Sequence, residues 1–545
     1  MIAVATDTAL GHPTVEPEHF DVLIVGAGLS GIGGAYRLQE RCPGRTFAIL
    51  EARASVGGTW DLFCYPGVRS DSDMFTLGYA FRPWPGRKSI ADGPSISRYV
   101  RDTAREYGID RKVRFNHRVT RASWSSERAL WLVEAERGAG AEPATFTCEF
   151  LLMCSGYYSY ADGYTPDFPG IARFKGRVVH PQDWTDDVDY ENKRVLVIGS
   201  GSTAVTLVPE LARSAAHVTM LQRSPTYIVA WPDEDIIANT ARRWLPAKAA
   251  CTLIRWKNVL AGMYFYWLCK KRPERAKAMI LDGVRAALGP DYDVATHFTP
   301  RYHPWDQRRC LVPNGDLFKS IRQGATTVVT DEIESFIETG VKLRSGRELE
   351  ADLIVTATGL ELQLMGGAEL DVDGQRLSAG RALSYKGAMC SDVPNLAAVF
   401  GYTNASWTLK ADLICSYVCR LLNYMERHGY RQCTPRNKDP SIELLPPVDF
   451  TSGYFQRAMD KLPKQGSRKP WRIYQNYILD IMTFRFAALD DGVLEFSGVS
   501  AAPGSPQMSR SGSPGQTDHG LSPRDGARPR SVEQKPAAFR SPFVD

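Results

Sequence analysis

The sequence lacks the charge imbalance and the apolar runs that indicate a nucleic-acid partner or a membrane span. Its 545 residues carry 66 Lys and Arg against 61 Asp and Glu, a net charge of +5, and show no basic stripe with interleaved aromatics. No segment reaches the roughly 18 apolar residues of a spanning helix. The first twenty residues lack the basic and apolar regions of a secretory signal, so we expect a cytoplasmic protein. Because the net charge is small and no basic stripe is present, we expect that it binds no nucleic acid.

Cysteine occurs in an odd number, eleven, without regular spacing. This pattern predicts reduced thiols rather than a disulfide framework, as in a cytosolic protein. Cys415 and Cys419 lie four apart in a helical pattern, which is typical of small core residues. We predict no metal site. The hydrophobic content of 43% and charged content of 23% are those of an ordinary globular protein, long enough for two or three domains.

One apolar segment, Val259–Cys269, is too short to span a bilayer and is flanked by Lys257 and by Lys270–Arg272. Its length favours a buried helix within an insertion. Its basic flanks and its aromatic residues also fit contact with a membrane surface, or the wall of a substrate tunnel. The sequence leaves these interpretations open, and with them a weak association with a membrane.

A glycine-rich turn follows the first buried strand, Asp21–Val25. The turn reads Gly26-Ala27-Gly28-Leu29-Ser30-Gly31, and after a helix the next strand, Thr46–Leu50, ends at Glu51. Gly26 permits a tight turn, Gly28 lets the backbone approach a pyrophosphate, and Gly31 lets helix and strand pack closely. The helix N-terminus attracts phosphates, and Glu51 can accept hydrogen bonds from a ribose diol. This unit predicts a dinucleotide site.

A second turn of the same kind stands between the strands Arg194–Ile198 and His217–Gln222. It reads Gly199-Ser200-Gly201-Ser202-Thr203-Ala204, and alanine is allowed at its third glycine position. The following strand ends in Gln222-Arg223-Ser224, without an acid. A carboxylate would repel a 2′-phosphate, whereas Arg223 and Ser224 can bind one. The second nucleotide is therefore predicted to be NADPH rather than NADH.

Two dinucleotide sites in one chain favour FAD in the first and NADPH in the second, with hydride passing from NADPH to the flavin. A reduced flavin can reduce a disulfide, reduce another acceptor or activate O₂. The first option needs a paired dithiol, and neither glycine turn has a CxxC or CxxxxC motif nearby. We predict an α/β fold with two Rossmann-like dinucleotide-binding domains, for FAD and NADPH, and a helical insertion.

Composition and periodicity divide the chain into parts. The C-terminal tail, from Ser497 on, is rich in Ser, Pro, Gly and Arg. It has too few apolar side chains to offset the entropy lost on folding, so we expect it to be disordered. Hairpin-like alternation spans 112–135, and helical patterns occur near 408–428 and 471–482. The predicted parts are a flexible N-terminus (1–19), the first part of the FAD domain (20–160), the NADPH domain (161–340) with its helical insertion (235–295), the second part of the FAD domain with C-terminal helices (341–496) and a disordered tail (497–545).

Three further motifs resemble the fingerprints of the flavin-dependent Baeyer–Villiger monooxygenases. Phe174, Gly176, His180 and Trp184 have the spacing FxGxxxHxxxW, 57–71 matches [AG]GxWxxxx[FY]P[GM]xxxD, and Ala357-Thr358-Gly359 matches the ATG segment. The resemblance covers residues 20 to about 490. It is closest to the ethionamide-activating subgroup, through 65–73, 304–308, 401–410 and 463–467. Thr185 and Gln307 depart from the pattern, and several relatives have at the latter position a Lys that helps bind the 2′-phosphate.

The resemblance implies an enzyme that uses NADPH and O₂ to convert ketones to esters or lactones through a C4a-peroxyflavin, with sulfur compounds as side substrates. An N- or S-oxygenating flavin monooxygenase without ketone activity is the first alternative. A non-oxygenating flavoprotein, such as a reductase or redox sensor, is the second. The ketone itself is not indicated by the sequence.

The resemblance places the guanidinium that holds the anionic peroxide and the developing oxyanion on Arg308, with Arg309 as the neighbouring alternative. Charge interactions strengthen in a dry site, so a fixed cation there is effective. Asp71 is expected to hold Arg308 by a charge-assisted pair. A buried Arg–Asp pair without a catalytic role is the competing interpretation.

His180 could act as a general base, but the resemblance places it in a linker that supports movement between domains, with Trp184 as a packing anchor. By position, Val119 contacts FAD through its backbone, and Arg69 and Ser70 face the nicotinamide side. The remaining FAD contacts and neighbours implied by position are Thr59, Trp60, Asp61, Leu62 and Asp71.

Overall fold

The computed structural model describes residues 16–498, and its first sheet is built around the first glycine turn. Strands β1 (Glu18–Val25) and β2 (Phe47–Leu50) are parallel and joined by α1 (Leu29–Arg41), and β1 also pairs in parallel with β6 (Glu142–Met153). Apolar residues fill these strands because both sheet faces are covered. The sheet order is β20 (Gln375–Arg376), β19 (Glu369–Val372), β4 (His117–Ser125), β5 (Leu130–Arg137), β6, β1, β2, β3 (Val113–Arg114), with β23 (Leu396–Ala398) beside β6.

The predicted hairpin over 112–135 corresponds to β4 and β5, which pair antiparallel with Trp124 opposite Trp131. Helix α11 (Trp407–His428) packs against α1 and buries Cys415 and Cys419, so the predicted core role of these thiols is confirmed. Helix α4 (Gly93–Glu106) packs in the same core. All eleven cysteines are free thiols, as predicted.

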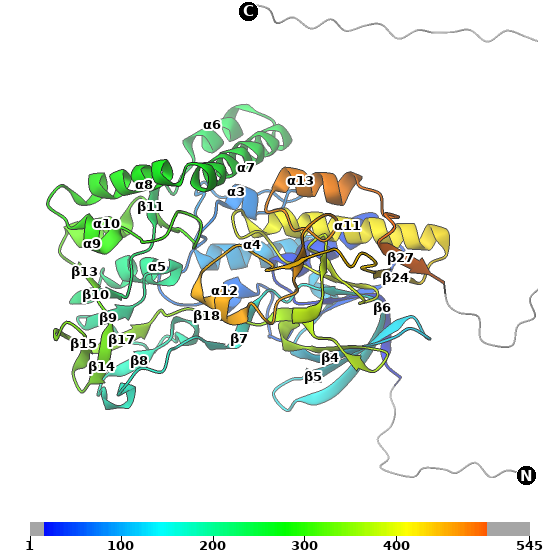
Figure 1. The fold of residues 1–545 in the computed structure, drawn as a ribbon, viewed down its shortest axis with the longest axis horizontal. Coiled ribbons are helices and arrows are strands. Elements are labelled where there is room, and N and C mark those ends of the chain that lie inside the picture. Colours follow the sequence, from blue (N-terminus) through cyan, green and yellow to red (C-terminus); the bar gives the residue numbers. More distant parts are fainter. Residues whose placement is uncertain (1–15, 499–545) are drawn as a thin grey trace, which may run out of the picture. The chain divides into compact units, whose positions relative to one another are not determined.

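A second, all-parallel sheet carries the second glycine turn. Its order is β13 (Thr326–Thr330), β10 (His217–Gln222), β9 (Arg194–Ile198), β17 (Leu353–Thr356), β8 (Arg177–Val179). Helices α5 (Ser202–Leu211) and α10 (Asp316–Arg322) pack in its core. The two sheets, each with its helices, confirm the predicted fold class (Figure 1). Small sheets join β14 (Ile333–Ile337), β15 (Gly340–Leu343) and β16 (Glu348–Glu350), and also β11 (Ile228–Trp231) with β12 (Cys310–Pro313).

The second sheet extends beyond the predicted domain boundary at 340. Strand β17 lies between β8 and β9, so residues up to about 356 belong to this sheet and not to the second part of the first domain. Strand β17 belongs to the second sheet because its four residues pair with Val195–Ile198 of β9. The connection between domains is formed by β7 (Tyr158–Gly163) and β18 (Leu360–Leu362), which pair antiparallel.

Four helices occupy the stretch predicted as a helical insertion: α6 (Ile236–Trp244), α7 (Ala247–Lys271), α8 (Pro273–Leu288) and α9 (Val294–Phe298). They lie at the top of Figure 1 and on its upper left side. Within residues 16–498, no helix is both long enough and apolar enough to cross a bilayer.

The helix predicted over 471–482 begins later than expected. Residues 471–476 are irregular, and α13 (Tyr477–Ile481) starts where the Asn476 side chain accepts from the backbone N–H groups of Ile478 and Leu479. A π-helical turn, Met482–Phe486, follows. Short helices and strand pairs complete the fold. The helices are α2 (Thr59–Leu62), α3 (Met74–Leu77) and α12 (Gly453–Ala458). The strand pairs are β24 (Gln432–Pro435) with β27 (Leu494–Ser497), β21 (Ser384–Tyr385) with β22 (Met389–Cys390), and β25 (Leu444–Leu445) with β26 (Gln465–Gly466).

The predicted flexible ends differ slightly from the structure. Strand β1 begins at Glu18, inside the part predicted as flexible, because it pairs with β6 from that residue on. Strand β27 likewise reaches Ser497. The rest of the predicted tail, apart from Gly498, lies outside the described residues.

Candidate active site

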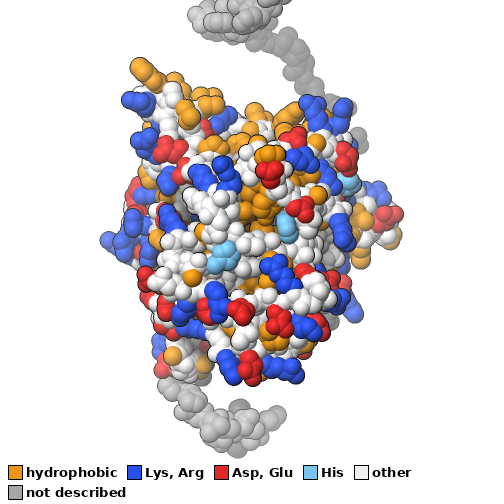
Figure 2. Space-filling view, turned by 90° about the vertical axis from the view of Figure 1, so that its left-hand side faces the viewer, with side chains coloured by type: hydrophobic (Ala, Val, Ile, Leu, Met, Phe, Trp, Pro, Cys, Tyr) orange, Lys and Arg blue, Asp and Glu red, His pale blue; other side chains and the backbone are white. Residues whose placement is uncertain are grey.

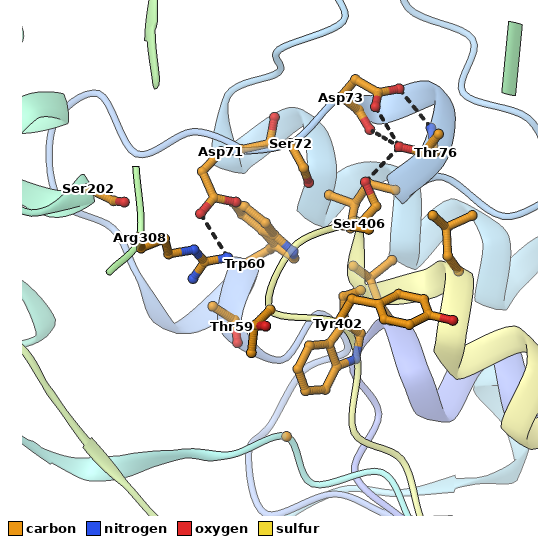
Figure 3. A pocket seen from close by; sticks show the side chains of 18 of the residues that line it. Thr59, Trp60, Asp71, Ser72, Asp73, Thr76, Ser202, Arg308, Tyr402 and Ser406 are labelled. Carbon is orange, nitrogen blue, oxygen red and sulfur yellow. Dashed lines mark hydrogen bonds and ion pairs between the residues drawn. The ribbon is translucent and has the colours of Figure 1, made fainter. Parts of the chain in front are cut away.

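A cavity of about 1470 Å³ runs from the first glycine turn to the start of α5 and to α7. Figure 3 shows part of its wall, where a dashed line joins the side chains of Asp71 and Arg308. The cavity brings together many of the residues predicted from the sequence. Those on its wall are Gly26, Gly28, Ser30, Glu51, Thr59, Trp60, Arg69, Ser70, Asp71, Val119, Ser202, Thr203 and Arg308.

Among the described residues, the others predicted to contact a cofactor do not line this cavity. They are Gly31, Asp61, Leu62, Gly199, Ser200, Gly201, Ala204, Gln222, Arg223 and Ser224. Asp61 accepts from the Arg53 guanidinium at 2.9 Å and from Ser55, so its carboxylate stabilises the loop before α2. Its contact with FAD stays a prediction.

The first glycine turn fits a pyrophosphate. Gly26 has a φ of 103°, in the region that favours glycine. A Cβ on Gly31 would lie 1.8 Å from the Gly26 carbonyl oxygen, so Gly31 lets α1 pack against the turn. Gly28 stands at the N-cap of α1 on the cavity wall, with Gly58 beside it. The free N–H groups at this helix end therefore face the cavity.

Glu51 is buried at the end of β2, with its carboxylate at the cavity wall. One oxygen accepts from the Ala27 N–H at 2.6 Å, and the other accepts from the Arg53 N–H at 2.9 Å. Burial raises the pKa of Glu51, although these backbone donors oppose the shift. A carboxylate oxygen can accept further bonds, so the side chain fits both the turn and a ribose diol.

The second glycine turn is more open. Gly199 has a φ of 134°, and a Cβ there would lie 2.3 Å from the Ala357 carbonyl oxygen. A Cβ on Gly201 would meet no described atom within 4 Å, which leaves room for a ligand over the N-terminus of α5. The Ser200 hydroxyl lies 3.0 Å from that of Thr226. Ser202 and Thr203 reach the cavity wall.

The three residues at the end of β10 differ in exposure and in their contacts. Arg223 and Ser224 are exposed beside the second turn, as a site for a 2′-phosphate requires. The Gln222 side chain is instead buried, and its amide donates to the His297 carbonyl oxygen at 2.7 Å and to the Thr330 hydroxyl at 2.9 Å. Gln222 therefore holds α9 against the second sheet, and its contact with a cofactor stays a prediction.

Arg308 and Asp71 form an ion pair, with Nη2 of Arg308 3.1 Å from Oδ2 of Asp71 (Figure 3). Asp71 comes from the loop before α3, and Arg308 from the loop before β12. The carboxylate is the main reason that the pKa of Arg308 rises well above its ordinary value. The hydroxyl groups of Tyr157, Tyr158 and Tyr454 act in the same direction. The pair thus presents a permanent cation to the cavity.

Arg309 has different surroundings. Its guanidinium carbon lies 5.1 Å from the centre of the Phe265 ring and 5.5 Å from that of Trp305. Burial lowers its pKa, and its Nε finds no hydrogen-bond partner among the described residues. Both arginines line the cavity, but in the described chain the ion pair with Asp71 belongs to Arg308.

Arg69 and Ser70 stand where the two domains meet. The Arg69 guanidinium pairs with Asp316, the first residue of α10, and donates to the Val205 carbonyl oxygen at 3.4 Å. The Ser70 hydroxyl is buried and accepts from the Ala91 N–H at 3.2 Å. Arg69 therefore links the loop before α3 to the second domain as well as lining the cavity.

The linker motif is part of the packed connection between the domains. Phe174 and Trp184 are buried, and a Cβ on Gly176 would lie 2.6 Å from the Asp352 carbonyl oxygen. The His180 ring contacts Gly163 and the carbonyl oxygen of Gly359. Among the described residues His180 is not part of the cavity wall. This placement supports the linker role over that of a general base.

Two groups of cavity contacts were not found from the sequence. The Trp407 indole N–H donates to the Ser30 hydroxyl at 2.8 Å, which ties α11 to the first glycine turn. The hydroxyls of Thr76 and Ser406 lie 2.6 Å apart (Figure 3). These pairs are more than 300 positions apart in the chain, and no local pattern signals them.

Comparisons with known proteins find flavin-dependent monooxygenases. Residues 90–259 match the family model described as flavin-binding monooxygenase-like, and residues 24–83 match that of an NAD(P)-binding Rossmann-like domain. The chain is 55% identical to FAD-containing monooxygenase EthA of Mycobacterium tuberculosis over 481 residues, covering 88% of this chain and 98% of that protein. It is 46% identical to the probable FAD-binding monooxygenase AlmA of Acinetobacter baylyi, covering 88% and 96%.

Solved structures resemble the fold over the same region. An oxidized steroid monooxygenase bound to NADP superposes with a TM-score of 0.66 at 25% identity, covering 77% of this chain and 88% of that one. The monooxygenase OTEMO in complex with FAD and NADP gives a TM-score of 0.64 at 21% identity, covering 77% and 87%. At such identity the second likeness concerns the fold alone.

Proposed function

The chain belongs to the FAD-containing monooxygenases, and from this premise we propose that it uses NADPH and O₂ to convert ketones to esters or lactones, with oxidation of sulfur compounds as a second activity. The observation that carries the proposal is the Arg308 guanidinium on the cavity wall, 3.1 Å from Asp71. Insertion of oxygen beside a carbonyl develops negative charge on oxygen. A fixed cation on the cavity wall stabilises that charge.

FAD and NADPH are the cofactors that the two glycine turns fit. The N–H groups of α1 beside Gly28 would hold the pyrophosphate of FAD, and Glu51 would accept from its ribose. The N-terminus of α5 would hold the pyrophosphate of NADPH, and Arg223 and Ser224 would hold its 2′-phosphate. The relative EthA is described as an FAD-containing monooxygenase and the solved steroid monooxygenase is bound to NADP, which supports this pairing. Bound FAD supplies the transfer of electrons from NADPH to dioxygen.

Arg308 and Asp71 have separate roles in the proposed reaction. Arg308 donates hydrogen bonds to the oxygen that becomes negative, and its raised pKa keeps it charged throughout. Asp71 fixes the direction of the guanidinium and compensates its charge when no substrate anion is present. The hydroxyl groups of Tyr157, Tyr158 and Tyr454 raise the pKa of Arg308 further, so the guanidinium stays charged.

The match to the flavin-binding monooxygenase-like model over 90–259 favours a second candidate, N- or S-oxygenation without ketone turnover. The two candidates differ in the protonation of the oxidant: attack on a carbonyl needs an anionic nucleophile, whereas oxidation of sulfur needs an electrophile. The cation that Arg308 provides favours the anionic form, and therefore the ketone reaction.

Product analysis with isotopically labelled O₂ tests the proposal. The purified FAD-loaded protein is incubated with NADPH and a panel of phenylacetone, several 2-alkanones and methyl phenyl sulfide. We expect an ester that contains one labelled oxygen atom for at least one ketone. Sulfoxide without ester from any ketone would select the second candidate. NADPH oxidation that yields hydrogen peroxide alone, without organic product, would contradict both.

A further inference from the structure

Helices α6 and α7 carry large apolar side chains on their exposed side. The exposed fraction is 80% for Ile236 and 82% for Trp244, both on α6. On α7, Leu253, Tyr264 and Trp267 are also exposed. At the upper edge of Figure 2, hydrophobic side chains stand among Lys and Arg side chains. Exposed apolar surfaces of this kind mark places where a protein contacts a partner or a membrane.

The same helices carry charge of one sign. Residues 236–273 contain eight Lys and Arg and no Asp or Glu. Arg243, Lys248 and Lys271 are exposed. The three acidic residues at 233–235, just before α6, each form an ion pair with a basic side chain. Lys257 pairs with Asp235 and Lys270 with Asp306, and the other six basic residues leave this stretch with a net positive charge beside its apolar side chains.

The apolar surface continues onto α13. The Trp256 ring on α7 lies 5.9 Å from the Tyr477 ring at the start of α13. Leu479 and, in the turn that follows, Met482 and Phe486 are exposed. We call α6, α7 and residues 477–486 the apolar-basic face, since they form one contiguous surface of two types of side chain.

The cavity reaches this face. Ile236 and Tyr264 line the cavity and are largely exposed. Gly262 and Tyr477 also belong to both. An apolar molecule that lies on the apolar-basic face is therefore at the mouth of the cavity.

We propose that the apolar-basic face docks onto a bilayer of anionic phospholipids, with α6 and α7 lying in the plane of the interface. Tryptophan and tyrosine side chains are favoured at the depth of the headgroups, and lysine and arginine side chains reach the phosphates while their stems stay apolar. The positive charge selects this occupant over a second copy of the chain, because two such faces would repel each other. Since no described helix can span a bilayer, the contact is peripheral.

Vesicle flotation of the FAD-loaded, full-length protein tests the proposal. We expect binding to vesicles of phosphatidylglycerol and phosphatidylcholine in equal amounts, weaker binding to pure phosphatidylcholine, and loss of the difference at high salt. Reversing the charge of Arg243, Lys248 and Lys271 to Glu should weaken binding about a hundredfold or more. A Trp244→Ser, Trp267→Ser variant should also bind weakly. Neither variant touches the cavity wall, so flavin content should remain as in the wild type.

A matched control reverses three exposed basic residues elsewhere, Arg101 and Arg105 on α4 and Arg322 on α10. This control should bind anionic vesicles as the wild type does. Equal binding of the two charge-reversal variants would overturn the proposal, as would equal binding of the wild type to both kinds of vesicle. A dimer in solution that Trp244→Ser dissociates, without vesicle binding, would show that the face joins two copies and would overturn it as well.

Discussion

The His180 imidazole joins the FxGxxxHxxxW motif to the Ala357–Gly359 segment, because its Nε2 lies 3.0 Å from the Gly359 carbonyl oxygen. Its Nδ1 lies 3.1 Å from the backbone nitrogen of Gln182. A backbone N–H donates and a carbonyl accepts, so the ring is the neutral tautomer with its proton on Nε2. Two motifs that are far apart in the chain thus meet through one side chain that must stay uncharged.

This arrangement predicts a pH-dependent stability. Burial lowers the pKa of His180 below its ordinary value. As the pH falls below about 6.5, the unfolded chain binds a proton at this position before the folded chain does, so stability present at higher pH is lost, by up to about 1.4 kcal/mol per pH unit. In His180→Gln the unfolding temperature should fall less steeply between neutral pH and pH ~5. The exposed His428→Gln is the control, and parallel profiles of wild type and His180→Gln would contradict the prediction.

Arg308 should be required for oxygen transfer. Arg308→Ala removes the cation that faces the cavity, and the rate of ester formation should drop about 10²–10³-fold. Arg308→Lys keeps the charge but not the forked geometry, so its loss should be smaller. Asp71→Asn removes the carboxylate partner and should lower the rate less than Arg308→Ala does.

The measurement is ester formed per NADPH oxidised, normalised to bound flavin. Arg309→Leu is the informative comparison, because the side chain packs between Phe265 and Trp305 and can be replaced by an apolar one. We expect Arg309→Leu to retain most of the product yield. A loss with Arg309→Leu that matches or exceeds that of Arg308→Ala would transfer the role to Arg309.

Gly31 and Gly201 should respond differently to substitution by alanine, because Gly31 is needed for packing and Gly201 for cofactor binding. A Cβ on Gly31 would lie 1.8 Å from the Gly26 carbonyl oxygen, so Gly31→Ala should displace α1 and abolish flavin binding. A Cβ on Gly201 meets no described atom within 4 Å, so Gly201→Ala should fold and bind flavin normally. It should nevertheless raise the KM for NADPH, since the pyrophosphate approaches the backbone there.

Flavin absorbance after gel filtration and the KM for NADPH check this pair. Retention of flavin by Gly31→Ala would show that the first turn relaxes around the new methyl group. An unchanged KM in Gly201→Ala would place the pyrophosphate away from the second turn.

The parts of the fold that local sequence determines were predictable. Each βαβ unit follows from a buried strand, a glycine turn and a helix, and these signals lie within about thirty residues. The ion pair of Arg308 with Asp71 followed from a resemblance, since nothing local joins these positions. The same resemblance predicts a linker role for His180, whose ring contacts Gly163 and the Gly359 carbonyl oxygen.

Other features of the fold and of the site depend on contacts that no local pattern encodes. Strand β17 inserts between β8 and β9 of the second sheet, and its partner residues lie far away in the chain. The Gln222 side chain turns toward α9 because His297 and Thr330 offer it acceptors. Asp61 turns toward Arg53, which donates to its carboxylate at 2.9 Å. In each case a partner that contacts the residue in the folded chain decides the place of a strand or the direction of a side chain.

Arg223 should decide the preference for NADPH over NADH. Its side chain is exposed at the end of β10, next to the second glycine turn, and no carboxylate ends this strand. A charge-assisted bond to the 2′-phosphate contributes about 1.5–3 kcal/mol, so Arg223→Ala should raise the KM for NADPH about 10–100-fold. NADH lacks this phosphate, and its kinetics should not change. Ser224→Ala should act in the same direction but more weakly, because it loses a neutral donor.

Initial rates with both cofactors check the prediction. The control is Arg213→Ala, since Arg213 is exposed just after the end of α5. An equal loss with NADPH and NADH would mean that Arg223 supports the fold of the second turn and does not read the phosphate.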